Sequence, residues 1–158
     1  MKIRFTLLSV SLLLTVLSGC ATGPKYTEVA SSFDTLESGK GRIFIYRPSS
    51  FGAAIQPKVR LDGEVVGKAK PKGFFFIDRA PGEYEIATST EVERSLSLTL
   101  DEGETRYVRL SVSMGFMVGH VYPELVEPSE AQEEIKTLSY IDSPVEDDQQ
   151  GVDPVEQE

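Results

Sequence analysis

The chain has a single cysteine, Cys20, among its 158 residues. No disulfide can therefore form within the chain, and a folded domain must be stabilised by its hydrophobic core. The length suits one domain of ordinary size, and a composition of 40% hydrophobic and 26% charged residues is typical of a folded protein. We predict one domain without covalent cross-links.

Histidine is equally scarce, because His120 is the only one. A Ser-His-Asp hydrolase would need it as the general base, but the chain has no Gly-x-Ser-x-Gly motif. The segment before it, residues 115–119, has no polar side chain, so we interpret His120 as a loop residue after a turn. With one histidine and no calcium-loop spacing, we expect neither a metal site nor a cofactor.

Basic residues are outnumbered, with 16 against 25 acidic ones, which gives a net charge of −9. Residues 1–19 hold Lys2 and Arg4 and no acid, so the rest of the chain carries a net charge of −11. An acidic surface repels nucleic acid and anionic headgroups, so neither is expected as a general partner.

The longest apolar run lies at the start of the chain. A basic head with Lys2 and Arg4 precedes residues 5–17, which carry no charge, and two small residues then lead to Cys20. This is the order of a secretory signal peptide. As a helix the apolar run spans about 20 Å, short of the ~30 Å hydrocarbon core. Residues 1–19 are therefore predicted to be a cleaved signal.

The sequence Leu-Ser-Gly-Cys at residues 17–20 resembles a bacterial lipobox. The Cys20 thiolate is a nucleophile that can take a diacylglycerol as a thioether. The resemblance implies cleavage before Cys20 and acylation of its new amine. Several acyl chains hold a protein on a bilayer, whereas one alone gives marginal binding. The alternatives are a soluble secreted protein and an uncleaved anchor.

The residue after the cysteine bears on the destination. It is Ala21 rather than aspartate, and the resemblance to enterobacterial lipoproteins implies transfer to the outer membrane. We therefore expect a lipid anchor at Cys20 in the bacterial outer membrane, with the domain facing the periplasm.

The remaining chain divides by composition into a tether and a β-domain. Residues 20–39 are mostly small, polar and turn-forming, and we interpret them as a flexible lipidated tether that spans about 25 Å. The alternative for part of this segment is a single helical turn packed against the domain, formed by Val29, Ala30, Phe33 and Leu36. In residues 40–141, short β-prone segments alternate with turn signals. The expected fold class is all-β, a single immunoglobulin-like or prealbumin-like antiparallel sandwich of about seven strands. The segments are 42–46, 57–61, 64–68, 74–78, 83–89, 93–100 and 105–113.

The last part of the chain changes character. After one more apolar segment at residues 121–126, a short helix is predicted with Ser129 as its N-cap. Three apolar residues would form its buried side: Ala131, Ile135 and Leu138. Residues 142–158 hold seven acidic and no basic residues, which predicts a disordered acidic tail.

Several motifs resemble those of a bacterial lipoprotein family whose domain has no assigned function. They are Gly-Arg-Ile-Phe-Ile-Tyr-Arg-Pro at 41–48, Leu-Asp-Gly at 61–63 with Gly67, Ala-Pro-Gly-Glu-Tyr at 80–84, Gly-Phe-Met-Val-Gly at 115–119 and Glu-Leu-Val at 124–126. The central motifs are also similar to PEGA-type and carboxypeptidase-regulatory-like β-sandwich domains of surface and envelope proteins. The resemblance implies a β-sandwich of the cell envelope and brings no catalytic residues.

A basic segment is one candidate for a partner surface. Lys68, Lys70 and Lys72 alternate along the chain, so an extended backbone places them on one face. Such a face either meets an acidic partner or protects an edge strand from pairing with other sheets.

Two apolar segments are further candidates. Phe75 lies in a run that is apolar on both faces, which indicates either a central strand or an exposed docking patch. Phe116 and Met117 lie between two glycines in a segment without polar side chains. That segment is either the continuation of a core strand or an apolar loop that serves as an interface.

Three functions remain open from the sequence. The first is a non-catalytic envelope module that binds a periplasmic protein or a cell-wall polymer, or supports envelope integrity. The second is a periplasmic hydrolase that pairs Asp78 with Glu83 or Glu85. The third is an inert structural spacer. The missing catalytic set and the resemblance favour the first, so we expect no enzymatic activity.

Overall fold

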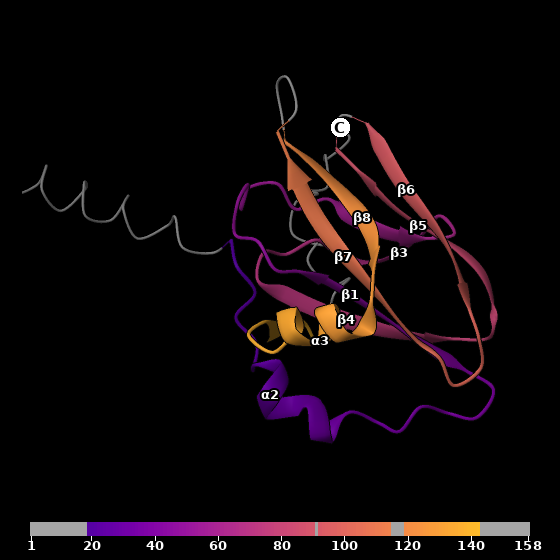
Figure 1. The fold of residues 1–158 in the computed structure, drawn as a ribbon. Helices are drawn as coiled ribbons and strands as arrows, with labels where there is room; N and C mark the ends of the chain where they lie inside the picture. The colour runs from indigo at the N-terminus through magenta and orange to yellow at the C-terminus, as the bar shows by residue number, and fades with distance from the viewer. Residues whose placement is uncertain (1–18, 91, 115–118, 143–158) are drawn as a thin grey trace, which may run out of the picture.

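The structure is a computed structural model of the 158-residue chain, and it describes residues 19–90, 92–114 and 119–142. Two β-sheets, one of five strands and one of four, pack against each other as a sandwich (Figure 1). The predicted all-β sandwich is confirmed, and the described residues form nine strands rather than about seven.

The five-stranded sheet has the order β8-β7-β1-β4-β9. Its strands are β1 (Gly41–Arg47), β4 (Gly73–Arg79), β7 (Thr105–Ser113), β8 (His120–Val126) and β9 (Ser139–Tyr140). The β1–β7 and β4–β9 pairs are parallel, so the expectation of a purely antiparallel sandwich is wrong for this sheet. Parallel neighbours need a crossover, and between β1 and β7 the chain passes through all strands of the four-stranded sheet and through β4.

The four-stranded sheet is antiparallel throughout and has the order β3-β2-β5-β6. Its strands are β2 (Lys58–Leu61), β3 (Glu64–Lys68), β5 (Gly82–Ser89) and β6 (Glu93–Leu100). The β2–β3 hairpin turns at Asp62 and Gly63, whose φ angles of 49° and 84° are both positive. Aspartate and glycine tolerate that conformation, which explains why this dipeptide sets the register of the hairpin.

The space between the sheets is filled by aliphatic side chains and Phe75. Strand alternation directs Ile43 and Ile45 of β1 into this layer, and Leu98 and Leu100 of β6 face them from the other sheet. Thr88 ties the two layers together, because its buried hydroxyl donates to the Val121 carbonyl at 2.6 Å.

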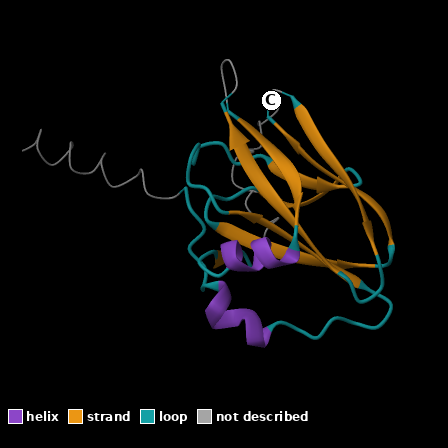
Figure 2. Ribbon diagram, viewed as in Figure 1, coloured by secondary structure: helices purple, strands orange, loops and turns teal. Residues whose placement is uncertain are grey.

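A second core covers the outer face of the five-stranded sheet. It is mainly aromatic, and it is closed by α3 (Pro128–Ile135), by α2 (Tyr26–Val29) and by the 3-10 turn η2 (Ala30–Ser32). Figure 2 shows both helices on this side of the sandwich. Strand β4 is therefore apolar on both faces because both faces are buried, with Phe74 at 0% and Phe75 at 1% exposure.

The segment predicted to be a flexible tether is docked on the domain. The Tyr26 amide donates to the Leu138 carbonyl at 3.0 Å, and the Tyr140 amide donates to the Pro24 carbonyl at 2.8 Å. Tyr26 and Phe33 add their rings to the aromatic core. The interpretation as a loose tether is therefore wrong for this part, since a few apolar residues suffice to dock a segment that is polar on average.

Helix α3 forms where the sequence predicts a helix, but its cap differs. Glu127 is the N-cap and Pro128 occupies the first turn, where its missing N–H leaves no hydrogen bond unmade. Ser129 therefore lies inside the helix and is not the cap. The expected apolar side is confirmed for Ala131 and Ile135, which are buried. Leu138 is also buried, but it lies three residues beyond the end of the helix. The predicted acidic tail after Asp142 lies outside the described residues.

Candidate functional site

Cys20 lies at the N-terminal boundary of the described structure and is exposed. The chain is held firmly on both sides of it. The Ala21 amide donates to the Pro71 carbonyl at 2.9 Å, and the Gln56 side-chain amide donates to the Gly19 carbonyl at 2.7 Å. The sulfur is thus accessible for modification, while its neighbours are fixed to the sandwich.

Arg47 organises the loop on which Gly19 rests. Its side chain is 0% exposed and donates to four main-chain carbonyls at 2.6–2.9 Å. The acceptors are the carbonyl oxygens of Phe51, Gly52, Ile55 and Ala69. Burial lowers the pKa of this guanidinium below its usual value. The coulombic interaction with Cys20 raises the same pKa, but by less. Neutral carbonyl dipoles rather than a carboxylate thus compensate the buried charge.

The loop after β1 forms one end of the sandwich together with the β7–β8 hairpin. Gly52 lies so close to Val112 that a Cβ built on the glycine would be 3.3 Å from the Val112 side chain. Ile55 fills the space where Gly119 would carry a side chain. Two side chains at this end are exposed, Phe51 at 53% and Met114 at 79%.

The three candidate lysines do not form one extended face. Lys68 ends the edge strand β3, whereas Lys70 and Lys72 lie in the turn between β3 and β4. Lys72 adopts a positive φ of 56°, so the alternation expected for an extended chain is lost at this residue. The turn nevertheless lies beside the candidate anchor, because Lys70 and Cys20 line the same recess of about 440 Å³.

Of the three apolar residues predicted for a partner surface, the structure describes only Phe75. Phe75 is 1% exposed and belongs to the core between the sheets, so it cannot be part of a partner surface. Its interpretation as a core residue is correct, because the four-stranded sheet covers the face of β4 on which Phe75 lies. Phe116 and Met117 lie outside the described residues.

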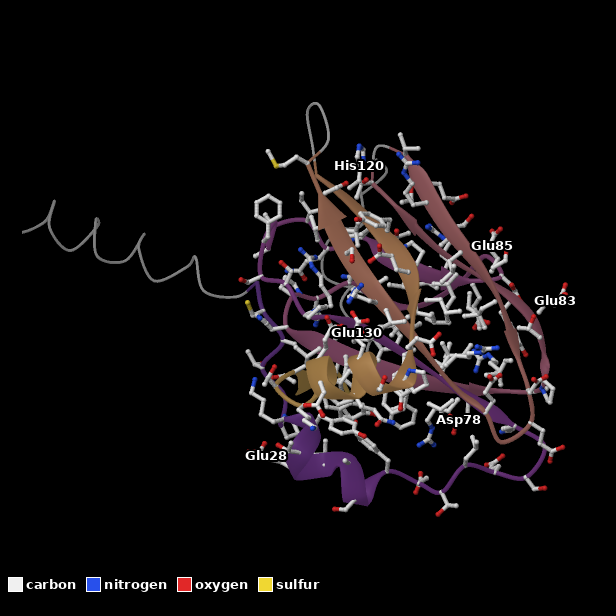
Figure 3. All side chains as sticks on the ribbon, in the orientation of Figure 1. Glu28, Asp78, Glu83, Glu85, His120 and Glu130 are labelled. Carbon is white, nitrogen blue, oxygen red and sulfur yellow. The ribbon has the colours of Figure 1, made fainter. Side chains whose placement is uncertain are left out.

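The carboxylates proposed for a hydrolase lie on opposite sides of the sandwich. Asp78 faces the aromatic core on the outer side of the five-stranded sheet, whereas Glu83 and Glu85 are exposed on the four-stranded sheet. Figure 3 shows this separation. Strand alternation therefore prevents Asp78 from pairing with either glutamate across one cleft.

Asp78 has a structural partner in Arg42. The guanidinium makes a bidentate contact, with Nε at 2.7 Å and Nη2 at 2.8 Å from the two carboxylate oxygens. Nη2 also donates to the Asp34 carbonyl at 3.0 Å, and the guanidinium carbon lies 4.2 Å from the centre of the Phe76 ring. The hydrogen bonds to Asp78 raise the pKa of Arg42, and burial opposes them. The pair fastens the N-terminal segment to the sheet.

We predict that Asp78→Ala lowers the free energy of unfolding by about 2 kcal/mol, because it leaves a largely buried arginine without its carboxylate. Glu85→Ala is the control, since this side chain is exposed and its loss should change stability by less than about 0.5 kcal/mol. Denaturant unfolding of the two variants gives the comparison. Equal stabilities would show that the ion pair does not hold the segment.

His120 is the first residue of β8, not a loop residue, and it pairs with Ser113 across the hairpin. Its Nδ1 lies 3.2 Å from the Thr90 hydroxyl. Neither neighbour is an acid that would orient a catalytic histidine. The structure therefore gives His120 a place in the β-ladder and assembles no triad around it in the described residues.

A charged network joins α3 to the five-stranded sheet. Arg109 of β7 contacts Glu130 at 2.7 Å and Glu134 at 2.9 Å, and Tyr46 donates to Glu134 at 2.7 Å. The hydrogen bond to Glu130 raises the pKa of Arg109, whereas burial is the main cause of the raised pKa of Tyr46. The network fixes the position of α3 on the sheet. No sequence pattern predicted these ion pairs.

No group of three or more histidine, cysteine or acidic side chains in residues 19–90, 92–114 and 119–142 is arranged to hold a metal ion. In the same ranges, no helix has the length and apolar character needed to cross a bilayer.

The chain is similar to proteins of a family whose function is unknown. The profile of a family described as "Protein of unknown function (DUF2846)" matches residues 37–121. An uncharacterized protein of Haemophilus influenzae (strain ATCC 51907 / DSM 11121 / KW20 / Rd) is 30% identical over 141 residues, which cover 86% of this chain and 82% of the relative. No solved structure matches the chain.

Proposed function

The chain belongs to the DUF2846 family of proteins of unknown function, and from this premise we propose that it is a lipid-anchored envelope lipoprotein. Its β-sandwich acts as a non-catalytic binding or structural module. The anchor is Cys20, which carries a diacylglycerol after residues 1–19 are removed. The lipid places the domain at the outer membrane, where it faces the periplasm.

One observation carries this proposal, namely that the lipobox cysteine is exposed at the boundary of the folded domain. The fold binds the main chain of Ala21, the residue after Cys20, but leaves Cys20 itself exposed. A structural cysteine would be buried, as free cysteines usually are. Exposure at this position suits a residue whose thiol is consumed by modification.

The proposed partner is an envelope protein or a cell-wall polymer. Glu83 and Glu85 of the four-stranded sheet and Arg106 of β7 line a recess of about 510 Å³ that is bounded by strands of both sheets. Acidic and basic groups there can form hydrogen bonds with a polar polymer or a protein segment. A hydrolase is not proposed, because the sandwich separates Asp78 from both glutamates.

The test replaces the sulfur by a hydroxyl and follows processing and location in the cell. Cys20→Ser should remain uncleaved and should be absent from the outer-membrane fraction, because no acyl chain can be attached. Thr22→Ser, which changes an exposed residue two positions away, should be processed and retained like the unchanged protein. Normal cleavage and outer-membrane retention of Cys20→Ser would disprove the anchor.

A further inference from the structure

The connection between the proposed anchor and the domain is very short. Ala21, the residue after Cys20, is already bonded to the Pro71 carbonyl. One extended residue reaches only about 3.5 Å, so the acyl-bearing sulfur cannot move far from the sandwich. The end of the domain next to Cys20 must then lie at the surface of the bilayer that holds the acyl chains.

From this geometry we infer that the loop end of the sandwich docks directly on the lipid bilayer, with Phe51 and Met114 in its interfacial region. The inference rests on the proposed function, since it takes Cys20 as the lipid anchor. We define the loop end as residues 48–56 together with the adjoining ends of β7 and β8. Figure 1 shows these segments beside the point at which the N-terminal chain enters the domain.

Exposed apolar side chains are concentrated at this end. The described residues expose four large hydrophobic side chains: Phe51, Val92, Met114 and Leu125. Phe51 adjoins Gly52, which packs against β7, and Met114 directly follows β7. The β5–β6 turn with Val92 is tied to the same end by the contact of Thr90 with His120. Leu125 alone lies farther along β8.

The loop that carries Phe51 is held in place before any lipid arrives. Arg47 Nη2 binds the carbonyls of Phe51 and Gly52, at 2.7 and 2.9 Å, and the Phe51 amide donates to the Ser49 hydroxyl at 3.0 Å. Because the loop is already ordered, little conformational entropy is lost when Phe51 enters the interface. A covalent anchor at Cys20 also raises the local concentration of lipid, so two apolar contacts suffice.

The charge distribution agrees with this orientation. Lys70 shares a recess with Cys20, and exposed Lys72 follows Pro71, whose carbonyl holds Ala21. With the domain docked in this orientation, both lysines lie at the depth of the lipid phosphates. The exposed acids Glu83 and Glu85 lie instead on the four-stranded sheet, along the recess that also contains Leu125. The net charge of −11 that remains once residues 1–19 are removed then disfavours any orientation that turns the acidic surface to anionic lipid.

The chain contains no tryptophan, so one substitution introduces a single fluorescent probe. We would reconstitute the lipidated Phe51→Trp protein in vesicles of phosphatidylethanolamine and phosphatidylglycerol, with and without brominated acyl chains. Leu125→Trp is the matched control, because its site is 45% exposed against 53% for Phe51. Leu125 lies about 17 Å along β8 from His120, the residue of β8 at the loop end, at 3.4 Å per residue.

Docking predicts that brominated lipid quenches the F51W emission about twofold and shifts it to the blue, while L125W emission is unchanged. Equal quenching of both probes, or a blue shift of F51W emission without quenching, would overturn the inference. The second result would mean that position 51 is covered by protein. Mass spectrometry of the same sample separates the two claims. Lipid on Cys20 with an unquenched F51W probe refutes only the docking, whereas a missing lipid refutes the anchor and the docking with it.

Discussion

Replacing Arg47 with methionine is expected to lower the free energy of unfolding by about 3 kcal/mol or more, because four carbonyls lose their donor. Removing both partners of a buried hydrogen bond can be nearly neutral, but here only the donor is removed. The carbonyls of Phe51, Gly52 and Ile55 can turn to water only if the loop opens. The substitution should therefore destabilise the domain and also release the loop that carries Phe51 and Gly52.

Two further variants define this effect. Arg47→Lys keeps the charge, but one ammonium cannot reach four carbonyls from two sides, so its stability should fall between those of the unchanged protein and Arg47→Met. Arg60→Met removes a half-buried arginine of β2 and should cost less than about 1 kcal/mol. Denaturant unfolding followed by circular dichroism measures all three. Equal losses in Arg47→Met and Arg60→Met would contradict the role given to Arg47.

Phe74→Ala is the second large effect, with an expected loss of about 3–5 kcal/mol in the free energy of unfolding. The Phe74 ring is 0% exposed and lies 5.5 Å from the Tyr26 ring and 5.4 Å from the Tyr140 ring, between centroids. Its removal leaves a cavity at the point where the N-terminal segment meets the sheet. The cost should therefore include partial release of that segment.

The release can be measured separately from global stability. The Tyr26 amide, which is bonded to the Leu138 carbonyl, should exchange its hydrogen faster in Phe74→Ala than can be explained by global unfolding. Phe51→Ala makes the same chemical change at an exposed site and should alter stability by less than about 0.5 kcal/mol. Phe74→Ala with the stability and the Tyr26 exchange of the control would show that the segment is not held by the aromatic core.

Local features of this fold were predictable from the sequence, whereas the pairing of distant strands was not. Strand positions followed from alternation and turn residues, so β3, β6 and β7 begin and end as predicted. The Asp62–Gly63 hairpin was also predictable, because its turn depends on those two residues alone. The parallel β1–β7 pair was not, since it depends on contacts about 60 residues apart in the chain.

The N-terminal segment shows why composition misleads. Its small and polar residues predicted a tether, but Tyr26 and Phe33 dock it on a second core that exists only once the sheet has formed. Phe74 and Phe75 were ambiguous for the same reason. A strand that is apolar on both faces can be understood only when both of its neighbouring layers are known.

The candidate site was predicted only where the chemistry is local. The anchor at Cys20 is proposed from four consecutive residues that resemble a lipobox, whereas Arg47 gave no comparable signal within its Arg-Pro pair. The carbonyls that accept from Arg47 come from loops 4 to 22 residues away, and no side-chain pattern marks them. Asp78 was misread for a similar reason, since its partner Arg42 lies on the neighbouring strand.

The most direct measurement is mass spectrometry of the N-terminal peptide of the protein taken from the outer-membrane fraction. A peptide that begins at Cys20 and carries a diacylglyceryl group is the predicted result. A peptide that retains residues before Cys20, or one that begins at an unmodified residue, would contradict the account.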